Sequence, residues 1–307
     1  MADDLQTPFD VAVVMVTIVR PTIAQALRSI YAQRFSGRIQ VMIGIDRWEG
    51  ERSTLQQLID ERPPNVAVTV IDLGYSTSRR NGGVYPSRFG GALKSILSYA
   101  ANSRYLAYLD DDNWYAPDHL ASLLAAVSGK DWAFSLRHFV DAQTGEVLCA
   151  DTWASVGPGR GMSNPLQGGF VDTNCYLFDK IACHDVFTEW AMTRYGDGTT
   201  GGDRQILQRV LPRPWGTNAA HTLYYRQDLL GLSKYMLWQL RCGGVDLARY
   251  LPADAIPNEA PWAESAGLDR QQDASSATSS ALPKLSRNSL CHCGSGKRYK
   301  DCHGLLA

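Results

Sequence analysis

The stretch Tyr105-Leu-Ala-Tyr-Leu-Asp110-Asp111-Asp112-Asn113-Trp114 decides how the chain around it is organised. An apolar run of strand-forming residues leads directly into three consecutive carboxylates. Pro117 follows, and the apolar residues after it repeat at helical spacing, so a helix is expected there. Because ligands of an α/β sheet bind beyond the carboxyl ends of its strands, the acidic cluster stands where a binding site is expected.

The three carboxylates favour a metal site. Adjacent carboxylates repel one another unless a cation or a donor-rich ligand joins them. In an extended segment the side chains alternate, so Asp110 and Asp112 are expected to share a face while Asp111 points away. Such oxygen ligands suit Mg²⁺ or Mn²⁺ shared with substrate phosphates. A solvated acidic turn that only caps the next helix is the alternative, but the preceding strand and the Pro-led helix favour the metal.

Strand and helix patterns alternate before this stretch. Residues 11–18 are a continuous β-branched run, which is typical of a strand buried on both faces. Residues 39–45 predict a second buried strand, and residues 66–71 predict a third strand. Apolar residues at helical spacing predict one helix after each of these strands, the first capped by Thr22 and the last beginning near residue 89. This order predicts an α/β domain with a largely parallel sheet.

The pattern is less regular after the acidic cluster. Residues 132–136 and 146–150 predict strands that extend the sheet, and residues 170–178 predict a further strand. Residues 157–169 hold five glycines and two prolines, so a mobile loop is expected there. Residues 201–211 predict a loop that runs into a helix, with Asp203 near the N-terminus of that helix.

The composition is that of an ordinary globular protein. The 307 residues are 45% hydrophobic and 20% charged, and the net charge is −1. This balance argues against a protein that mainly binds nucleic acid or a membrane surface. The N-terminus has no signal-peptide pattern, and the apolar run at residues 11–16 is too short to span a bilayer. The seven cysteines, three of them clustered near the end, are typical of a reducing compartment with a metal site, so we expect a cytoplasmic protein.

The order of elements resembles the family 2 glycosyltransferases of GT-A fold. Asp46 closes the second strand, and Leu109-Asp-Asp-Asp-Asn-Trp114 closes the fourth. The resemblance covers roughly residues 9–226, about one domain, with the best local matches at residues 108–118 and at Gly202-Asp203-Arg. It implies a Rossmann-like GT-A domain that binds a nucleotide-diphospho-sugar and Mg²⁺ or Mn²⁺, and that transfers the sugar with inversion.

The resemblance assigns residues to the nucleotide. Thr17 and Asp46 match the positions that hold the base, and the carboxylate of Asp46 can accept a base imide N–H. Arg88 matches a contact to the nucleotide or its diphosphate. An exposed Asp46 that merely closes its strand is the alternative to the first role. Arg79 or Arg80, in the same loop, is the alternative to Arg88.

The resemblance also assigns the metal and the chemistry. Asp112 matches the metal ligand, whereas Asp110 or Asp111 matches a contact to the ribose. Asp203 matches the general base, because inversion in one displacement requires a base on the face opposite the leaving group. A helix cap is the alternative role for Asp203. Asp172 is a second acidic candidate, on the strand expected to line the acceptor pocket.

The chain also departs from the family pattern. The turn after the first strand reads Val16-Thr-Ile-Val-Arg-Pro21, so Val19 stands where an aromatic residue would stack on the base. The identity of the nucleotide base is therefore left open, and a UDP-sugar is favoured. The Gln-x-x-Arg-Trp motif of processive synthases is missing, so transfer of a single sugar is expected. His221 could reach the metal, although a lone histidine is more often structural.

The C-terminal segment at residues 287–304 resembles the SEC-C zinc motif found at the end of the SecA translocation ATPase. Three thiolates and one imidazole suit a closed tetrahedral Zn²⁺ site, and the residues are Cys291, Cys293, Cys302 and His303. About twenty residues cannot form a core, so zinc must supply the fold. Free reduced cysteines are the alternative. The module is basic, and the resemblance makes a protein or ribosome partner plausible.

The sequence thus predicts three parts: a GT-A-like domain at 1–262, a disordered linker at 263–286 rich in Ala, Ser, Gln and Asp, and a zinc module at 287–307. The expected function is metal-dependent, inverting transfer of one sugar to an unknown acceptor, with the zinc module recruiting a partner or client. One alternative is a nucleotidyltransferase on a similar core, although the first turn lacks the expected glycines. The other is a non-catalytic, regulatory sugar-nucleotide-binding protein that acts through its zinc module.

Overall fold

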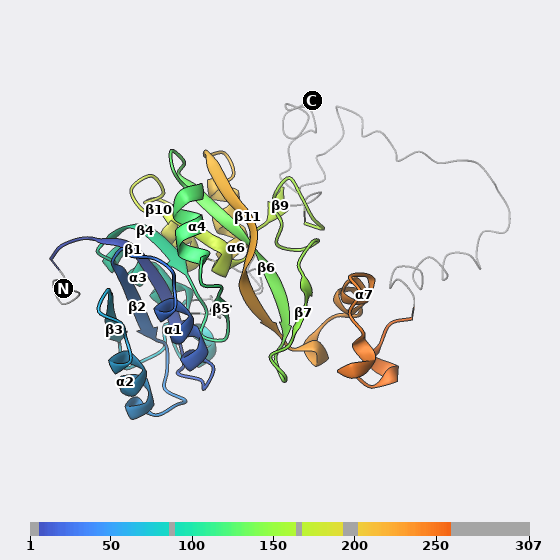
Figure 1. The fold of residues 1–307 in the computed structure, drawn as a ribbon. Helices are drawn as coiled ribbons and strands as arrows, with labels where there is room; N and C mark the ends of the chain where they lie inside the picture. The colour runs from blue at the N-terminus through green and yellow to red at the C-terminus, as the bar shows by residue number, and fades with distance from the viewer. Residues whose placement is uncertain (1–5, 86–89, 164–167, 193–201, 259–307) are drawn as a thin grey trace. The chain divides into compact units, whose positions relative to one another are not determined.

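A nine-stranded sheet forms the centre of the protein (Figure 1). The computed structural model describes residues 6–85, 90–163, 168–192 and 202–258, all within the compact unit Met1–Asn258. The sheet has the order β3-β2-β1-β4-β10-β6-β11-β5, and β7 pairs with β6. Its strands are β1 (Phe9–Thr17), β2 (Ile39–Ile45), β3 (Val66–Asp72), β4 (Ser103–Tyr108), β5 (Trp114–Tyr115), β6 (Trp132–Asp141), β7 (Val147–Ala150), β10 (Tyr176–Asp179) and β11 (Trp215–Gln227).

The first half of the sheet is parallel, as predicted. β1 lies between β2 and β4 and runs parallel to both, and β2 runs parallel to β3. Every residue of β2 is buried, which explains why all of them except Gln40 are apolar. The connecting helices are α1 (Ile23–Tyr31), α2 (Arg52–Asp60) and α3 (Gly91–Ala100). Because β1, β2 and β4 point the same way, the residues that follow all three strands meet at one edge.

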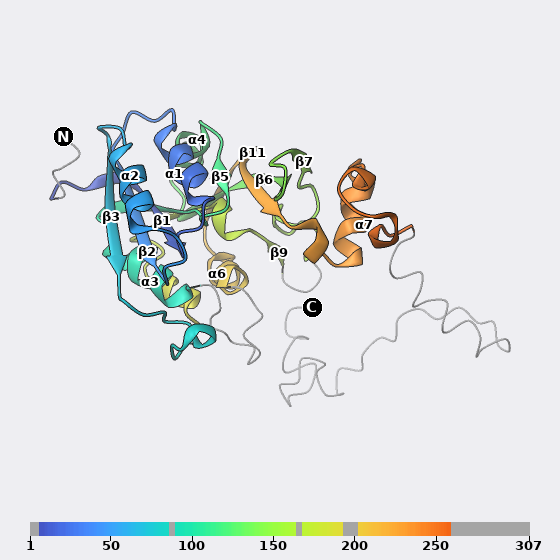
Figure 2. The same cartoon turned by 90° about the horizontal axis from the view of Figure 1, so that it is seen from below.

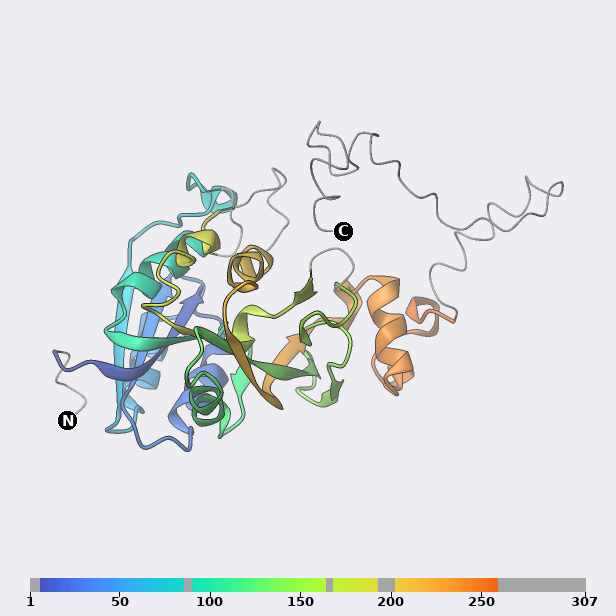
Figure 3. The same ribbon diagram turned by 90° about the horizontal axis from the view of Figure 1, so that it is seen from above.

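The second half of the sheet mixes directions. β10 runs antiparallel between β4 and β6, whereas β6 and β11 are parallel. Figures 2 and 3 show α1 and α4 (His119–Ala126) on one face of the sheet and α3 and α6 (Gly202–Val210) on the other. The main core lies between these layers and includes the fully buried Trp132, Tyr108 and Tyr176. Covering both faces stabilises the sheet by removing this apolar surface from water.

A second apolar cluster follows β11, in a segment for which the sequence analysis made no prediction. It joins Phe139 and Ala154 to the short elements η4 (Leu229–Gly231), α7 (Lys234–Cys242), η5 (Leu247–Arg249) and η6 (Ala253–Ala255). The side chain of Ser233 caps α7 by accepting a hydrogen bond from the Met236 N–H at 3.3 Å. In the described part of the chain, no helix has the length and apolar character needed to cross a bilayer.

The strand predicted over residues 170–178 is present only at its two ends and is wrong between them. Phe170 belongs to β9 (Gly169–Phe170), which pairs with β8 (Gly157–Pro158), and β10 begins only at Tyr176. Between them lies the 3₁₀ turn η2 (Thr173–Cys175), because the Asp172 side chain accepts the Asn174 N–H at 2.9 Å and turns the chain. The same pairing holds both ends of the loop expected to be mobile, whose residues 164–167 lie outside the described residues.

The predicted Thr22 cap is also wrong. Thr22 precedes α1 at the N-cap position, but its side chain makes no capping hydrogen bond and its hydroxyl is buried without a partner. The backbone there is helical rather than extended, and in that conformation the hydroxyl does not reach the first free N–H groups. The start predicted for α3 near residue 89 lies outside the described residues.

Candidate functional site

A cavity of about 550 Å³ lies at the edge where β1, β2 and β4 end. Its volume is in the range of small-molecule sites, about 300–1,000 Å³. It brings together every predicted nucleotide-binding, metal-binding and catalytic residue of the GT-A-like domain that the structure describes, namely Thr17, Asp46, Asp110, Asp111, Asp112, Asp172 and Asp203. Arg88 and the predicted zinc ligands Cys291, Cys293, Cys302 and His303 lie outside the described residues.

The side chains of the acidic triplet were expected to alternate along an extended strand. This expectation is wrong. β4 ends at Tyr108, and Asp111 and Asp112 form a turn. Asp111 is only 2% exposed; it accepts the Thr17 hydroxyl at 2.5 Å and pairs with the guanidinium of Arg20. Asp111 is therefore committed to contacts within the protein, which tie the acidic turn to the end of β1.

Asp110 is held from two other elements. Lys94 of α3 donates its Nζ at 3.2 Å, and the side-chain amide of Asn174 donates at 2.9 Å. Burial opposes the charged form of Asp110, but these contacts outweigh it and lower the pKa of this carboxyl. Asp110 therefore carries a charge at neutral pH, with Lys94 directly beside it.

Asp112 is the member of the triplet that is least engaged. Its side chain is 34% exposed, and Arg20 Nη2 lies 3.2 Å from one of its oxygens. Burial and then the charge of Asp110 raise its pKa to about 6. A hard cation bound here would relieve that repulsion and lower this pKa.

A divalent metal fits this donor set. Among the residues that the structure describes, no group of three or more His, Cys, Asp or Glu side chains is arranged to hold a metal ion. Mg²⁺, however, usually takes one or two carboxylates and completes its shell with water and substrate phosphates. Asp112, crowded by Asp110 and facing the cavity, is such a carboxylate.

Another part of the cavity is built around Asp46. One oxygen of Asp46 accepts the Ser76 hydroxyl at 2.8 Å, and the other accepts the Asn81 amide at 3.3 Å. Asp46 is only 7% exposed, so the alternative of an exposed residue that merely closes its strand is wrong. Arg80 lines the same part of the cavity, as the sequence analysis allowed for this loop.

The unusual turn after β1 also shapes the cavity. Val19 adopts a φ of 62°, which is rare for a β-branched residue, and its N–H donates to the Thr17 hydroxyl oxygen at 2.7 Å. The Val19 side chain is 3% exposed and packs in the main core, whereas Ile18 and Arg20 line the cavity. Residue 19 therefore offers no surface for a base to stack on.

Asp203 lies in the first turn of α6, as predicted, where the Arg204 N–H donates to Oδ1 at 2.8 Å. Burial and then the charge of Asp172 raise its pKa to about 6. α6 lies close to Trp190, since a Cβ on Gly202 would come within 2.9 Å of that ring. Asp203 is thus a carboxylate with a pKa near neutral pH, as a general base requires.

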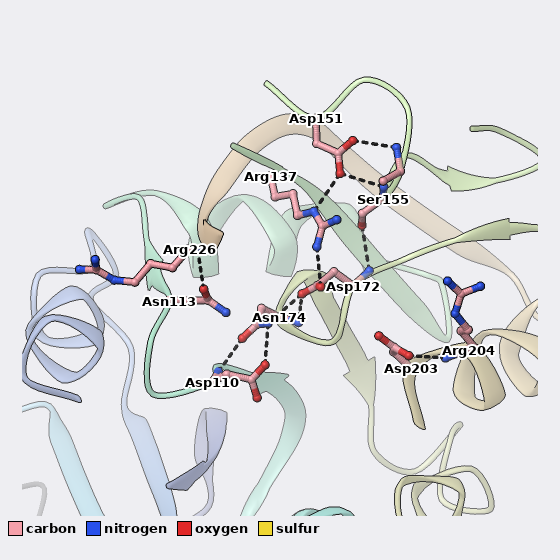
Figure 4. Close-up of polar contacts among 11 residues, drawn as sticks. Asp110, Asn113, Arg137, Asp151, Ser155, Asp172, Asn174, Asp203, Arg204 and Arg226 are labelled. Atoms are coloured by element: carbon pink, nitrogen blue, oxygen red, sulfur yellow. Dashed lines mark hydrogen bonds and ion pairs between the residues drawn. The ribbon is translucent and has the colours of Figure 1, made fainter. Parts of the chain in front are cut away.

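Asp172, the second acidic candidate, is bound on both oxygens (Figure 4). Arg137 of β6 donates Nη1 to Oδ2 at 2.6 Å. Asn174 donates to Oδ1 from its backbone at 2.9 Å and from its amide at 2.7 Å. These contacts occupy three of the roughly four acceptor sites of the carboxylate, so Asp172 is the poorer candidate for a base.

Sequence reasoning missed four side chains at this site: Arg20, Lys94, Arg137 and Asn174. Lys94 falls between the apolar positions of its predicted helix, as an ordinary surface residue would. None of the four side chains therefore carried a signal in the sequence. His221, considered as a metal ligand, packs beside His138 with ring centroids 5.1 Å apart and does not line the cavity, so the structure supports its structural alternative.

Solved structures resemble this fold. S. aureus TarS matches with a TM-score of 0.53 at 10% identity, over 75% of this chain and 38% of that chain. S. aureus TarS 1-349 in complex with UDP-GlcNAc matches with a TM-score of 0.51 at 10% identity, over 75% of this chain and 64% of that chain. The described residues share the fold of these structures, which is the predicted GT-A fold.

The C-terminal segment has its own relatives. Residues 287–305 match the family model of the SEC-C motif. The SecA protein translocase subunit of Janthinobacterium sp. (strain Marseille) is 42% identical over 69 residues, and that of Herminiimonas arsenicoxydans is 41% identical over 70 residues. Each match covers 22% of this chain and only 8% of the SecA protein. The predicted likeness of the tail to SecA is confirmed, and the matches of 69 and 70 residues extend beyond residues 287–305.

Proposed function

We propose that this protein is a metal-dependent, inverting glycosyltransferase that moves one sugar from a nucleotide-diphospho-sugar to an acceptor, with a UDP-sugar favoured. One observation carries the proposal. A single cavity on a GT-A fold holds an acidic turn after β4, a hydrogen-bonded carboxylate after β2 and a half-buried carboxylate at the start of α6. The acidic turn suits the diphosphate and its metal, the carboxylate after β2 suits the base of the nucleotide, and the carboxylate of α6 suits the acceptor hydroxyl.

The nucleotide side of the cavity uses the residues around Asp46. We assign Thr17 and Asp46 to the base, with Ser76 and Asn81 orienting the carboxylate. Arg20 and Lys94 bring positive charge to the end of the cavity that holds the acidic triplet. Guanidinium and ammonium groups suit phosphate oxygens, so these two residues are assigned to the diphosphate.

The chemical step is assigned to Asp203. Its carboxylate removes the proton from an acceptor hydroxyl, whose oxygen forms a bond to the anomeric carbon as the bond to the diphosphate breaks. The proton ends on Asp203, and the electron pair of the broken bond leaves with the nucleoside diphosphate. Asp112, with Asp110 beside it, would hold Mg²⁺ or Mn²⁺. When bound, the metal neutralises charge developing on the departing diphosphate.

A thermal-shift screen tests this function. We expect UDP, among UDP, GDP, ADP and CDP, to raise the melting temperature most, and only when Mn²⁺ or Mg²⁺ is present. A ligand at one hundred times its Kd stabilises the folded protein by about 2.7 kcal/mol. The proposal fails if no nucleoside diphosphate shifts the melting temperature with either metal. A larger shift by nucleoside triphosphates than by diphosphates would favour a nucleotidyltransferase instead.

We assign the C-terminal segment, residues 287–307, to the recruitment of a partner or client. We assign Zn²⁺ to Cys291, Cys293, Cys302 and His303 within the SEC-C match, and a macromolecular partner, such as a protein or a ribosome, to the basic module. A tethered second site raises the effective concentration of a partner without entering the chemistry.

Removing residues 287–307 is expected to remove about one zinc per chain and to leave the melting temperature of the GT-A domain nearly unchanged. Turnover of a small acceptor should also be retained. Metal analysis by mass spectrometry and a UDP-release assay measure these effects. Cys242→Ser, which alters an exposed cysteine outside the tail, should retain the zinc. Zinc that persists in the shortened protein would place the ligands elsewhere, and lost turnover would make the tail part of the active site.

A further inference from the structure

A buried arginine stands behind the acceptor side of the cavity. Arg137 is 5% exposed, and its guanidinium donates to Asp151 at 2.8 Å and to Asp172 at 2.6 Å. The ring of Tyr225 lies 4.3 Å from the guanidinium carbon. Burial by itself would lower the pKa of Arg137, but the two carboxylates outweigh it and raise this pKa. A buried cation needs such partners, so Arg137 holds Asp172 as a fixed anion.

Asn174 takes up the other oxygen of Asp172. It is fully buried in η2, and both its backbone N–H and its side-chain amide donate to Asp172 Oδ1, at 2.9 and 2.7 Å. The amide nitrogen has a second hydrogen, which it donates to Asp110 Oδ2 at 2.9 Å. The amide oxygen accepts the backbone N–H of Asp110 at 2.5 Å.

The carboxamide of Asn174 is therefore fully used. Each of its two N–H groups donates to a different carboxylate, and its oxygen accepts from the backbone of the acidic turn. Figure 4 shows Asn174 between Asp110 and Asp172, joined to both. An aspartate has the same shape, but it would replace the two donors by a third negative charge.

We propose that Asn174 is a positioning residue that couples the two halves of the site. It fixes Asp110, which follows β4 on the nucleotide side, relative to Asp172, which Arg137 anchors on the acceptor side. The binding sites of the diphosphate and the acceptor are then fixed relative to each other. The acceptor oxygen can therefore approach the anomeric carbon in line with the leaving group. This inference rests on the proposed function and extends it to a residue outside the catalytic step.

The test compares Asn174→Asp with Asn218→Asp. Asn218 also donates its amide to two partners, Ser122 and Thr222, but it does not line the cavity, so it is the matched control. Calorimetry measures binding of UDP with Mn²⁺, and UDP release from UDP-GlcNAc measures turnover. Because Asn174→Asp removes the donors to both carboxylates and adds a charge between them, it should bind UDP–Mn²⁺ about 10- to 100-fold more weakly. Its kcat should fall as well, whereas Asn218→Asp should stay within about twofold of the wild type in both measurements.

A second variant, Asn174→Ser, removes the bridge without adding a charge and guards against a charge effect on folding. It should also lose both affinity and kcat, with a circular dichroism spectrum like that of the wild type. Wild-type affinity and kcat in either folded variant would overturn the inference. Failure of both variants to fold would also overturn it, because Asn174 would then serve the fold alone. A wild-type protein that neither binds UDP nor releases it rejects the proposed function, and that outcome is recognised before any variant is compared.

Discussion

Replacing Asp203 by asparagine is expected to lower kcat by about 10²–10⁴-fold while nucleotide-sugar binding stays nearly unchanged. Asparagine keeps the shape of the side chain, and its amide oxygen can still accept the Arg204 N–H that Asp203 accepts at 2.8 Å. It cannot take a proton from an acceptor hydroxyl at neutral pH. Calorimetry with UDP and Mn²⁺ measures binding, and UDP release from a sugar nucleotide measures turnover.

The same residue sets the expected pH profile. Burial and the charge of Asp172 raise the pKa of Asp203 to about 6, and only the deprotonated form acts as a base. The rate should therefore be level above this pKa and fall about tenfold for each pH unit well below it. In the Asp203→Asn variant, the residual rate should no longer fall as the pH is lowered through this pKa. If the rate of this variant still falls at low pH as in the wild type, another group causes the pH dependence.

A matched control separates chemistry from helix capping. Asp228 also accepts a backbone N–H at the start of a 3₁₀ turn, and it does not line the cavity. Asp228→Asn should therefore retain both binding and kcat. If Asp203→Asn instead loses its fold together with its binding, Asp203 is a structural cap, and Asp172 becomes the candidate base despite its contacts with Arg137 and Asn174.

Replacing Asp112 by asparagine should abolish the metal-dependent part of nucleotide binding. Asp112 is the member of the acidic turn that is least engaged by other side chains. Burial and then the charge of Asp110 raise its pKa, and a bound cation would relieve that repulsion. An amide is a weaker ligand for a hard cation than a carboxylate. Loss of a second-shell partner costs about 10–100-fold in metal affinity, so loss of a direct ligand should cost at least as much. Titration of Mn²⁺ in the presence of UDP, followed by melting temperature, measures this loss.

Asp60→Asn, on the exposed end of α2, serves as the control and should keep the full Mn²⁺ response. If Asp112→Asn also keeps it, the metal assignment is wrong. Arg20, which contacts both Asp111 and Asp112, would then be the cation that faces the diphosphate. Arg20→Met would in that case remove nucleotide binding with or without metal.

Much of this protein follows from its sequence. Strands buried on both faces need continuous apolar runs, and helices need apolar residues at helical spacing, so the periodicity alone predicted β1 to β4 and their connecting helices. The parallel order then explains why Thr17, Asp46 and the acidic triplet share one cavity. Asp203 was predictable for the same kind of reason, since a short local pattern marks the start of its helix.

The contacts that orient these residues depended on tertiary structure alone. Asn174 reaches Asp110 across 64 residues, and Arg137 reaches Asp172 across 35 residues. Both contacts exist because β10 inserts antiparallel between β4 and β6, and the sheet order of such a strand is absent from local periodicity. The inward turn of Asp111 has a similar origin, since its partners Thr17 and Arg20 lie 94 and 91 residues away. Periodicity reports how each segment meets water, whereas the partners of a buried polar group depend on which segments the packed core brings together.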